Sequence, residues 1–379
     1  NESKKKKIWN FRTEFVTLAA ECKAVNIGQG FPNIAAPDFV TNLLKNVCNH
    51  PEEVDYHQYT RGFGHPRLVK AISKLYTKTL KVDLNPDTNV LITVGGYLSL
   101  YYTFMGWLND GDEVIVIEPA FDCYIPQILM ADGVPLPVPL ELSPNPKNSS
   151  DYRLNLQSVE EKISSRTKML VLNNPHNPTG KLFTEDELSG LADIAKRHDL
   201  LVVSDEVYEW HIYPGKKMIR FASLPGMFER TITIGSAGKT FSITGWKTGW
   251  SIGPAHLLGP LKLLHQNCVF TCPTPLQEAI AQALELELEL FSSNPDKSYL
   301  LTVMTSNLRG KRNRMAEMLR NAGMKPIIPE SGYFMLADIS DLGNGIIKLA
   351  TIPSSAFYSD EYKAQNDHFI RVCFFKVNF

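Results

Sequence analysis

The sequence predicts an α/β protein with a mostly parallel central sheet flanked by helices, and a smaller α+β domain beside it. Three observations support this fold class. Short β-branched runs alternate with helical stretches through the middle of the chain, these runs are apolar almost throughout, and the pattern changes after about residue 298. At 379 residues the chain also exceeds one typical domain of roughly 150 residues.

Five segments are predicted to be parallel strands. Each is apolar almost throughout, because a strand covered by helices on both faces has no side that meets solvent. The segments are Asn89–Val94, Glu113–Pro119, Lys168–Asn174, Leu200–Glu206 and Arg230–Gly235.

Helices are predicted between and after these strands. The segment Thr184–His198 begins with Thr184 and Glu187 in capping-box spacing and ends in basic residues, as a helix does. The segment Ala283–Phe291 alternates like a strand, but its residues are strong helix formers and we predict a helix. The smaller domain is predicted from a long amphipathic helix over 301–323 and short strands over 332–339 and 369–375.

Composition and charge are those of an ordinary globular protein. Hydrophobic residues make up 44% of the chain and charged residues 21%. The net charge of -1 does not indicate binding to nucleic acid or to an anionic membrane. We interpret the basic run Lys4–Lys7 as a flexible tail. The six cysteines are scattered without histidine partners, so we expect reduced thiols and no metal site. We expect a cytoplasmic protein; a mitochondrial one is the alternative, since a removed leader is compatible with a chain beginning at Asn1.

A Gly-Gly turn between a predicted strand and a helix offers a site for an anion. The backbone amides of Gly95, Gly96 and Tyr97 would point outward from the positive end of the helix. Gly-Gly at such a junction is more often only a turn, so this motif does not decide by itself. It is neither G-x-G-x-x-G nor a Walker loop, which argues against a dinucleotide or a nucleoside triphosphate.

Polar side chains follow two of the predicted strands. Asp205 lies just past the end of one buried strand, with Tyr208 three residues on, and the string Asn173–Gly180 follows another strand. Residues in these positions line the ligand crevice of an open parallel sheet. A carboxylate there requires a cation, for which a protonated ring nitrogen is suitable. The alternative, that Asp205 is a helix N-cap, is about equally supported by this motif alone.

Three motifs, in their order and separation, resemble the fold-type I pyridoxal-phosphate aminotransferases. They are NNPHNPTG (Asn173–Gly180), SDEVYEW (Ser204–Trp210) and SAGKTFSITGWKTGW (Ser236–Trp250). The strings NIGQGFP, QYTRGFGHPRL and GDEVIVIEPAFDCY further resemble the kynurenine aminotransferase group, also known as glutamine transaminase K or cysteine-S-conjugate β-lyase. The resemblance implies an N-terminal arm with part of the small domain over 1–40, a large cofactor-binding domain over 41–297 and a C-terminal small domain over 298–379.

The resemblance assigns residues to the cofactor, pyridoxal 5′-phosphate. Lys239 would form the Schiff base with its aldehyde and then carry a proton. Asp205 would pair with the pyridine nitrogen and keep it protonated. Tyr208 and Asn177 would hydrogen-bond the ring hydroxyl, and Phe121 would stack on the ring. The phosphate would be held by Gly95, Gly96, Tyr97, Ser236 and Lys247.

The resemblance also assigns residues to the substrate and to a second subunit. Arg371 would bind the substrate α-carboxylate as a bidentate pair, with Gly30 and Asn177 close by. From its strand pattern alone, Arg371 would be taken for a surface residue. Tyr59 resembles a tyrosine that reaches the phosphate of the neighbouring subunit, which implies a homodimer with shared active sites.

The implied activity is transfer of an amino group from an L-amino acid to a 2-oxo acid in two half-reactions. The expected donors are kynurenine, glutamine, methionine and aromatic amino acids, because the crevice has aromatic walls and no obvious second cation. One alternative is a β-lyase of cysteine conjugates, and another is a broader aromatic or alanine-type aminotransferase. A third alternative is a regulator that binds the cofactor without catalysis. The chain retains every catalytic residue type, which argues against this alternative.

Three features depart from the kynurenine aminotransferase group. Arg12 stands where the group often has a tryptophan that walls the substrate pocket, and Thr271 stands where it can show histidine. The segment 341–360 is shorter than its counterpart, and the chains of the group continue beyond a point like Phe379. Because the first two positions bear on side-chain selectivity, kynurenine as the donor is less firmly implied than transamination.

Overall fold

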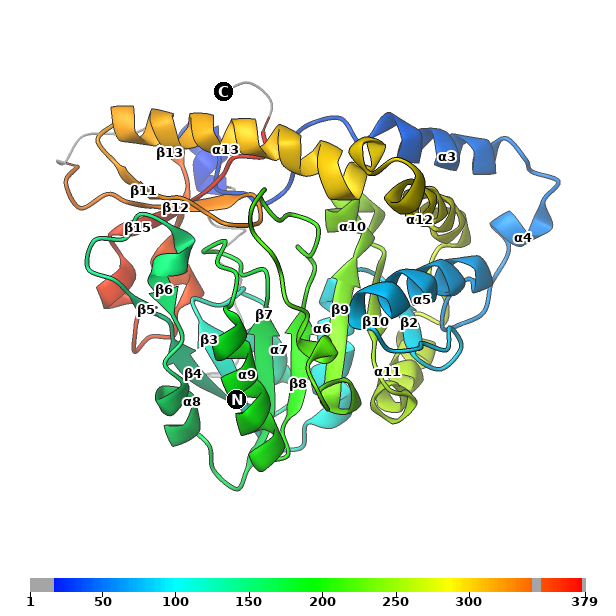
Figure 1. Ribbon diagram of the computed structural model, residues 1–379, viewed down its shortest axis with the longest axis horizontal. Coiled ribbons are helices and arrows are strands. Elements are labelled where there is room, and N and C mark those ends of the chain that lie inside the picture. Colours follow the sequence, from blue (N-terminus) through cyan, green and yellow to red (C-terminus); the bar gives the residue numbers. More distant parts are fainter. Residues whose placement is uncertain (1–16, 343–348, 377–379) are drawn as a thin grey trace.

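The computed structural model describes residues 17–342 and 349–376 and is built around a seven-stranded sheet in the order β2-β10-β9-β8-β7-β3-β4 (Figure 1). All neighbouring pairs from β9 to β4 are parallel, whereas β10 runs antiparallel to β2 and β9. The predicted mostly parallel sheet is confirmed. Its strands are β2 (Val90–Thr93), β3 (Glu113–Glu118), β4 (Val134–Pro139), β7 (Thr167–Asn173), β8 (Leu201–Asp205), β9 (Thr231–Ser236) and β10 (Gly249–Ile252).

Two of these strands were not predicted. The strand β4 carries proline at every second position, which is tolerated because β4 lies at the edge of the sheet. The strand β10 is short, and its glycine and serine conceal the apolar pattern of a buried strand. Both elements depend on their place in the sheet, which their local sequence does not indicate.

Helices cover both faces of this sheet. On β3, Val114 and Val116 pack with one set of helices, whereas Ile115 and Ile117 pack with the other, as the alternation of a strand requires. The first set comprises α6 (Gly96–Trp107), α7 (Tyr124–Met130) and α11 (Ala255–Cys268), and the second comprises α8 (Leu156–Glu161) and α9 (Glu185–Arg197).

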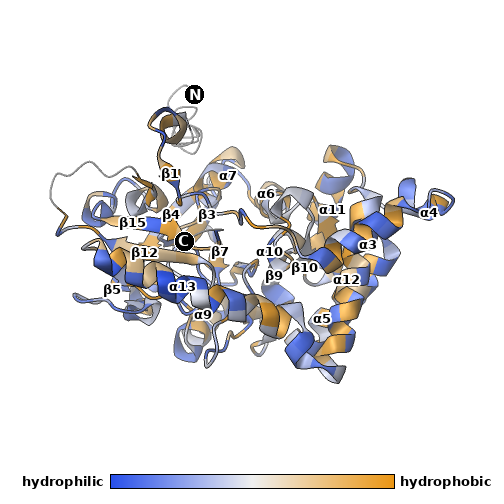
Figure 2. Cartoon of the chain, turned by 90° about the horizontal axis from the view of Figure 1, so that it is seen from above, coloured by the Kyte–Doolittle hydropathy of each residue, from blue (hydrophilic) through white to orange (hydrophobic). Residues whose placement is uncertain are grey.

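The predicted helix at 184–198 is confirmed as α9, including its capping box. The Thr184 backbone N–H donates to Glu187 Oε2 (2.8 Å), and the Glu187 N–H donates to Thr184 Oγ1 (3.2 Å). The ambiguous segment 283–291 is helical within α12 (Thr274–Ser293), against which α3 (Asp38–Cys48) and α5 (Pro66–Leu80) pack. Figure 2 shows these three helices grouped on one side of the molecule.

A second, antiparallel sheet lies on the other side, in the order β11-β12-β15-β14. The long helix α13 (Met304–Asn321) lies along it in Figure 1, and the predicted strands at 332–339 and 369–375 are its two central strands. The strands are β11 (Lys325–Ile327), β12 (Phe334–Asp338), β14 (Ile352–Pro353) and β15 (Phe369–Cys373). Shorter elements are β1 (Val25–Asn26) with β13 (Leu349–Ala350), β5 (Glu141–Leu142) with β6 (Tyr152–Arg153), α4 (Val54–His57) and α10 (Ala237–Thr240).

A pair of contacts, here called the Glu118–Ser359 clasp, ties the central sheet to the segment between β14 and β15. The Glu118 carboxylate at the end of β3 accepts hydrogen bonds from the Ser359 N–H (2.7 Å) and hydroxyl (3.0 Å). Two residues away on each side, the Ala120 N–H donates to the Phe357 carbonyl (2.7 Å). Burial raises the pKa of Glu118 to about 7, although the hydrogen bonds from Ser359 oppose that shift.

Replacing Glu118 with glutamine should make stability less dependent on pH. A carboxyl whose folded pKa lies above its unfolded value favours the folded state at low pH, and this contribution is lost as pH rises through about 7. Between pH 5 and pH 8, the wild-type free energy of unfolding should therefore fall by about 2 kcal/mol more than that of Glu118→Gln. Urea titrations at several pH values measure this, and parallel pH profiles for the two proteins would refute it.

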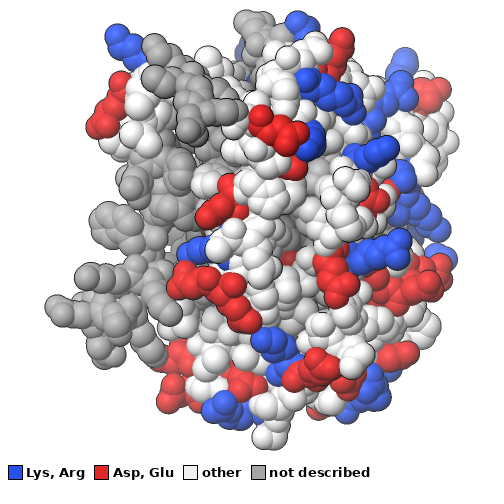
Figure 3. All heavy atoms as spheres, turned by 90° about the vertical axis from the view of Figure 1, so that its left-hand side faces the viewer, with Lys and Arg blue, Asp and Glu red and all other residues white. Residues whose placement is uncertain are grey.

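The surface shows no specialised charge pattern on the face drawn in Figure 3, where cationic and anionic side chains are interspersed. No helix among the described residues is both long and apolar enough to cross a membrane. The run Lys4–Lys7 and Arg12 lie outside the described residues.

Candidate active site

A cavity of about 370 Å³ opens where the carboxyl ends of β7, β8 and β9 meet the second sheet. Every site residue predicted from the sequence lines it except Tyr59. The residues of this set come from well-separated stretches of the chain, between Gly30 and Arg371, so the fold has brought distant residues together. They are Gly30, Gly95, Gly96, Tyr97, Phe121, Asn177, Asp205, Tyr208, Ser236, Lys239, Lys247 and Arg371.

One end of the cavity is the N-terminus of α6. Gly95 has a φ of 76°, which glycine adopts without strain, and it turns the chain from β2 into α6. A Cβ at Gly249 would lie 2.5 Å from the Gly96 nitrogen, so only glycine lets β10 pass beneath this turn. Lys247 also has a positive φ (50°), and its Nζ lies 5.7 Å from the centre of the Tyr97 ring. Backbone amides and an ammonium thus meet at one place, as an anion requires.

The middle of the cavity contains the carboxylate of Asp205 at the end of β8. Asp205 is buried; its Oδ2 accepts from the Tyr124 hydroxyl (2.6 Å) and its Oδ1 from the Val207 N–H (3.3 Å). Burial raises its pKa, which these hydrogen bonds and Lys239 oppose. Asp205 forms no ion pair within the described residues. A buried carboxylate without a close cation favours a positively charged ligand atom beside it.

Lys239 follows β9 on the single turn α10 and lines the cavity. Its Nζ donates to the Tyr333 hydroxyl (2.8 Å) and lies 3.4 Å from the Gly30 carbonyl oxygen. The rings of Tyr208 and Tyr333 lie 5.5 Å and 5.4 Å from the same nitrogen. Lys239 is therefore held among aromatic rings and hydrogen-bond acceptors.

Arg371 lies on the central strand β15 and is buried, contrary to the surface position that its strand pattern alone suggests. Its guanidinium is stacked between the rings of Phe334 (4.2 Å) and Phe357 (4.6 Å). Nη1 donates to Asn177 Oδ1 (3.1 Å) and Nη2 to the Gly28 carbonyl (3.0 Å). Such a planar cation, held on both faces, suits bidentate binding of a carboxylate.

Gly30 makes room for this arrangement. A Cβ at Gly30 would lie 2.5 Å from the Phe334 ring, so a larger residue would displace one of the two rings that hold Arg371.

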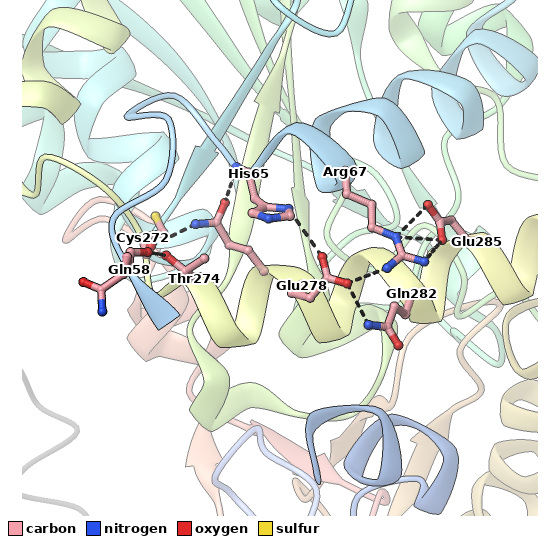
Figure 4. Close-up of polar contacts among 9 residues, drawn as sticks. Gln58, His65, Arg67, Cys272, Thr274, Glu278, Gln282 and Glu285 are labelled. Atoms are coloured by element: carbon pink, nitrogen blue, oxygen red, sulfur yellow. Dashed lines mark hydrogen bonds and ion pairs between the residues drawn. The ribbon is translucent and has the colours of Figure 1, made fainter. Parts of the chain in front are cut away.

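Tyr59 does not line the cavity; it is 82% exposed and contacts the ring of Phe270 (5.4 Å between centroids). Its loop is nevertheless fixed to α12, because Thr274 Oγ1 donates to the Gln58 carbonyl (2.7 Å) (Figure 4). Figure 4 also shows Arg67, at the start of α5, bridging Glu278 and Glu285 of α12. Tyr59 is thus an exposed side chain on an anchored loop.

Four residues that contact the predicted set were not predicted. Tyr124 holds Asp205, Tyr333 holds Lys239, and Phe334 and Phe357 stack on Arg371. A signal for Tyr124 was its place in the EPAFDCY string, three residues after Phe121. No spacing in the sequence points to the other three, because each lies on a different segment of the fold from its partner, and Tyr333 is 94 positions from Lys239.

Comparison with known proteins agrees with this geometry. Residues 23–374 match the family model of aminotransferase class I and II. The chain is 45% identical over 390 residues to kynurenine–oxoglutarate transaminase 3 of Rattus norvegicus, covering 97% of this chain and 85% of that one. It is 42% identical over 394 residues to kynurenine–oxoglutarate transaminase 1 of Homo sapiens, covering 97% and 92%. The structure of N-succinyldiaminopimelate aminotransferase from Mycobacterium tuberculosis has a TM-score of 0.86 at 31% identity, covering 97% and 93%.

Proposed function

The chain belongs to the class I and II aminotransferases and has their fold-type I architecture, and we propose that it transfers the amino group of L-kynurenine or a similar neutral amino acid to a 2-oxo acid with pyridoxal phosphate as cofactor. The observation that carries the proposal is the cavity itself. It places a lysine amine, a buried carboxylate, an anion site and a buried arginine around one space.

The cavity fits pyridoxal phosphate in three respects. The amides at the start of α6, Ser236 and Lys247 form a site for its phosphate. Asp205 is buried and forms no ion pair within the part of the chain that the structure describes, and a protonated pyridine nitrogen would supply a cation for it. Lys239 has a primary amine able to bond its aldehyde. When bound, the cofactor would withdraw electrons from the substrate Cα and so make its proton removable.

The residues of this chain then have distinct tasks. Arg371 binds the substrate α-carboxylate and fixes the orientation of Cα. The amine of Lys239 would take the proton from the substrate Cα and deliver it to the carbon that carried the aldehyde of the cofactor. Asp205 keeps the pyridine nitrogen protonated, and the Tyr124 hydroxyl keeps Asp205 directed at that position.

The proposed donor class follows from the charge and lining of the cavity. Among the described residues its cationic side chains are Lys239, Lys247 and Arg371, each already assigned to the cofactor or the α-carboxylate. No cation remains for an acidic side chain, whereas Phe31 and Tyr97 offer apolar contact. The two kynurenine–oxoglutarate transaminases that match nearly the whole chain support kynurenine as the first donor to test.

We also propose that the enzyme is a homodimer. Tyr59 is presented on an anchored loop and is exposed in one chain, and a second copy would place that side chain within reach of a phosphate site.

The visible spectrum of the purified protein tests the proposed reaction. With L-kynurenine or L-glutamine and no 2-oxo acid, the absorption of the bound aldehyde form should be replaced by that of the amine form, and a 2-oxo acid should restore it. The donor with the faster change identifies the substrate class. An absorption band that no amino acid changes would refute amino transfer, and a protein that takes up no pyridoxal phosphate would refute the cofactor.

A further inference from the structure

Tyr333 contacts the reactive amine through a hydroxyl that is itself fixed. The hydroxyl accepts a hydrogen bond from Lys239 Nζ (2.8 Å) and donates to the Gly30 carbonyl (3.0 Å). That carbonyl also lies 3.4 Å from Nζ. The three groups therefore form a closed triangle from three distant parts of the chain.

The ring of Tyr333 cannot easily move. It is 1% exposed and lies against the rings of Tyr208, His211, Phe334 and Phe375, at 4.8 to 5.5 Å between centroids. Burial raises the pKa of Tyr333 well above its ordinary value, so the phenol keeps its proton at neutral pH. A protonated phenol can donate to Gly30 and accept from Lys239 at the same time.

We propose that Tyr333 is a positioning residue for Lys239, holding the amine near the substrate Cα whenever that amine is not bonded to the cofactor. The inference rests on the proposed function. A free lysine side chain rotates about several bonds, and holding it in one orientation removes an entropic cost from the proton transfer. The hydrogen bonds to Tyr333 and Gly30 fix the amine at the wall of the cavity that Lys239 lines.

The test compares Tyr333→Phe with Tyr213→Phe. Both remove one buried hydroxyl: that of Tyr213 donates to the Gly332 carbonyl (2.9 Å), next to Tyr333, and makes no contact with Lys239. We expect Tyr333→Phe to lower kcat roughly 10- to 100-fold, with KM within about threefold and cofactor absorption retained. The kinetic isotope effect of Tyr333→Phe, measured with a donor deuterated at Cα, should be larger than that of the wild type, because proton transfer becomes slower. Tyr213→Phe should change neither kcat nor the kinetic isotope effect.

A second measurement uses the protein freed of cofactor. Reductive methylation of Lys239 at pH 7, followed by mass spectrometry, reports how much of the amine is neutral. Loss of the Tyr333 acceptor removes a hydrogen bond from the ammonium form, so Lys239 should be methylated severalfold faster in Tyr333→Phe than in wild type or Tyr213→Phe.

The outcomes separate the inference from the proposed function. Equal methylation rates with an unchanged isotope effect in Tyr333→Phe would overturn the positioning role. A wild-type protein that transfers no amino group would overturn the proposed function, and the methylation rates would still decide whether Tyr333 holds the Lys239 amine. Thermal unfolding of both variants, compared with wild type, shows whether a change arises from misfolding, and similar loss of kcat in both variants would also overturn the role.

Discussion

Replacing Lys239 with alanine is expected to lower kcat/KM by at least about 10⁴-fold while pyridoxal phosphate still binds. Lys239 supplies both the amine that bonds the aldehyde and the base that moves the Cα proton, and no other lysine or histidine lines the described cavity near it except Lys247 at the anion site. The phosphate and ring contacts do not depend on Lys239, so the cofactor remains bound noncovalently. Steady-state kinetics and equilibrium dialysis of the cofactor measure the two effects.

A suitable control for Lys239→Ala is Lys325→Ala. Lys325 is an exposed lysine of β11 that pairs with Asp341 (2.6 Å) away from the cavity, so its removal should leave kcat/KM within about twofold. Activity of Lys239→Ala within tenfold of wild type would contradict the assignment of Lys239 as the reactive amine.

The central sheet could be predicted because its strands are buried on both faces. A run such as that of β7 or β8 has no solvent side, so its apolar composition identifies it without knowledge of its neighbours. The strands β4 and β10 could not be found in this way. Proline in β4 is acceptable only at an edge, and glycine in β10 is required by the close turn at Gly96, so both depend on sheet order.

The residues of the candidate site likewise differ in whether their local sequence predicts their position. Residues directly after predicted strands, such as Asp205, could be placed at the cavity because the carboxyl ends of parallel strands share one edge. Roles for Lys239 and Arg371 came from motif resemblance, since isolated basic residues carry no such signal. Tyr333 was missed because it meets Lys239 only after the second sheet packs against the first, 94 positions apart in sequence.

Replacing Arg220 with methionine is expected to lower the free energy of unfolding by about 3–5 kcal/mol. Arg220 Nη1 pairs with Glu206 (2.8 Å) and Glu209 (2.5 Å), and both carboxylates are buried. Its guanidinium also lies 5.2 Å from the centre of the Tyr76 ring, and Tyr76 donates to Glu209 (2.5 Å). Methionine would keep much of the apolar contact but leave two buried carboxylates without a cation. Urea unfolding followed by circular dichroism measures the loss.

The matched control is Arg197→Met, which also removes an arginine paired with glutamate. Arg197 is largely exposed and pairs with Glu160 at the surface, so we expect a loss of at most about 1 kcal/mol. If the uncompensated carboxylates cause the instability, adding Glu206→Gln and Glu209→Gln to Arg220→Met should recover most of it. Because Glu206 and Glu209 flank Tyr208 and follow Asp205, Arg220→Met should also weaken cofactor binding. Equal stability losses in the two arginine variants would show that the buried ion pairs of Arg220 stabilise the protein no more than the exposed ion pair of Arg197.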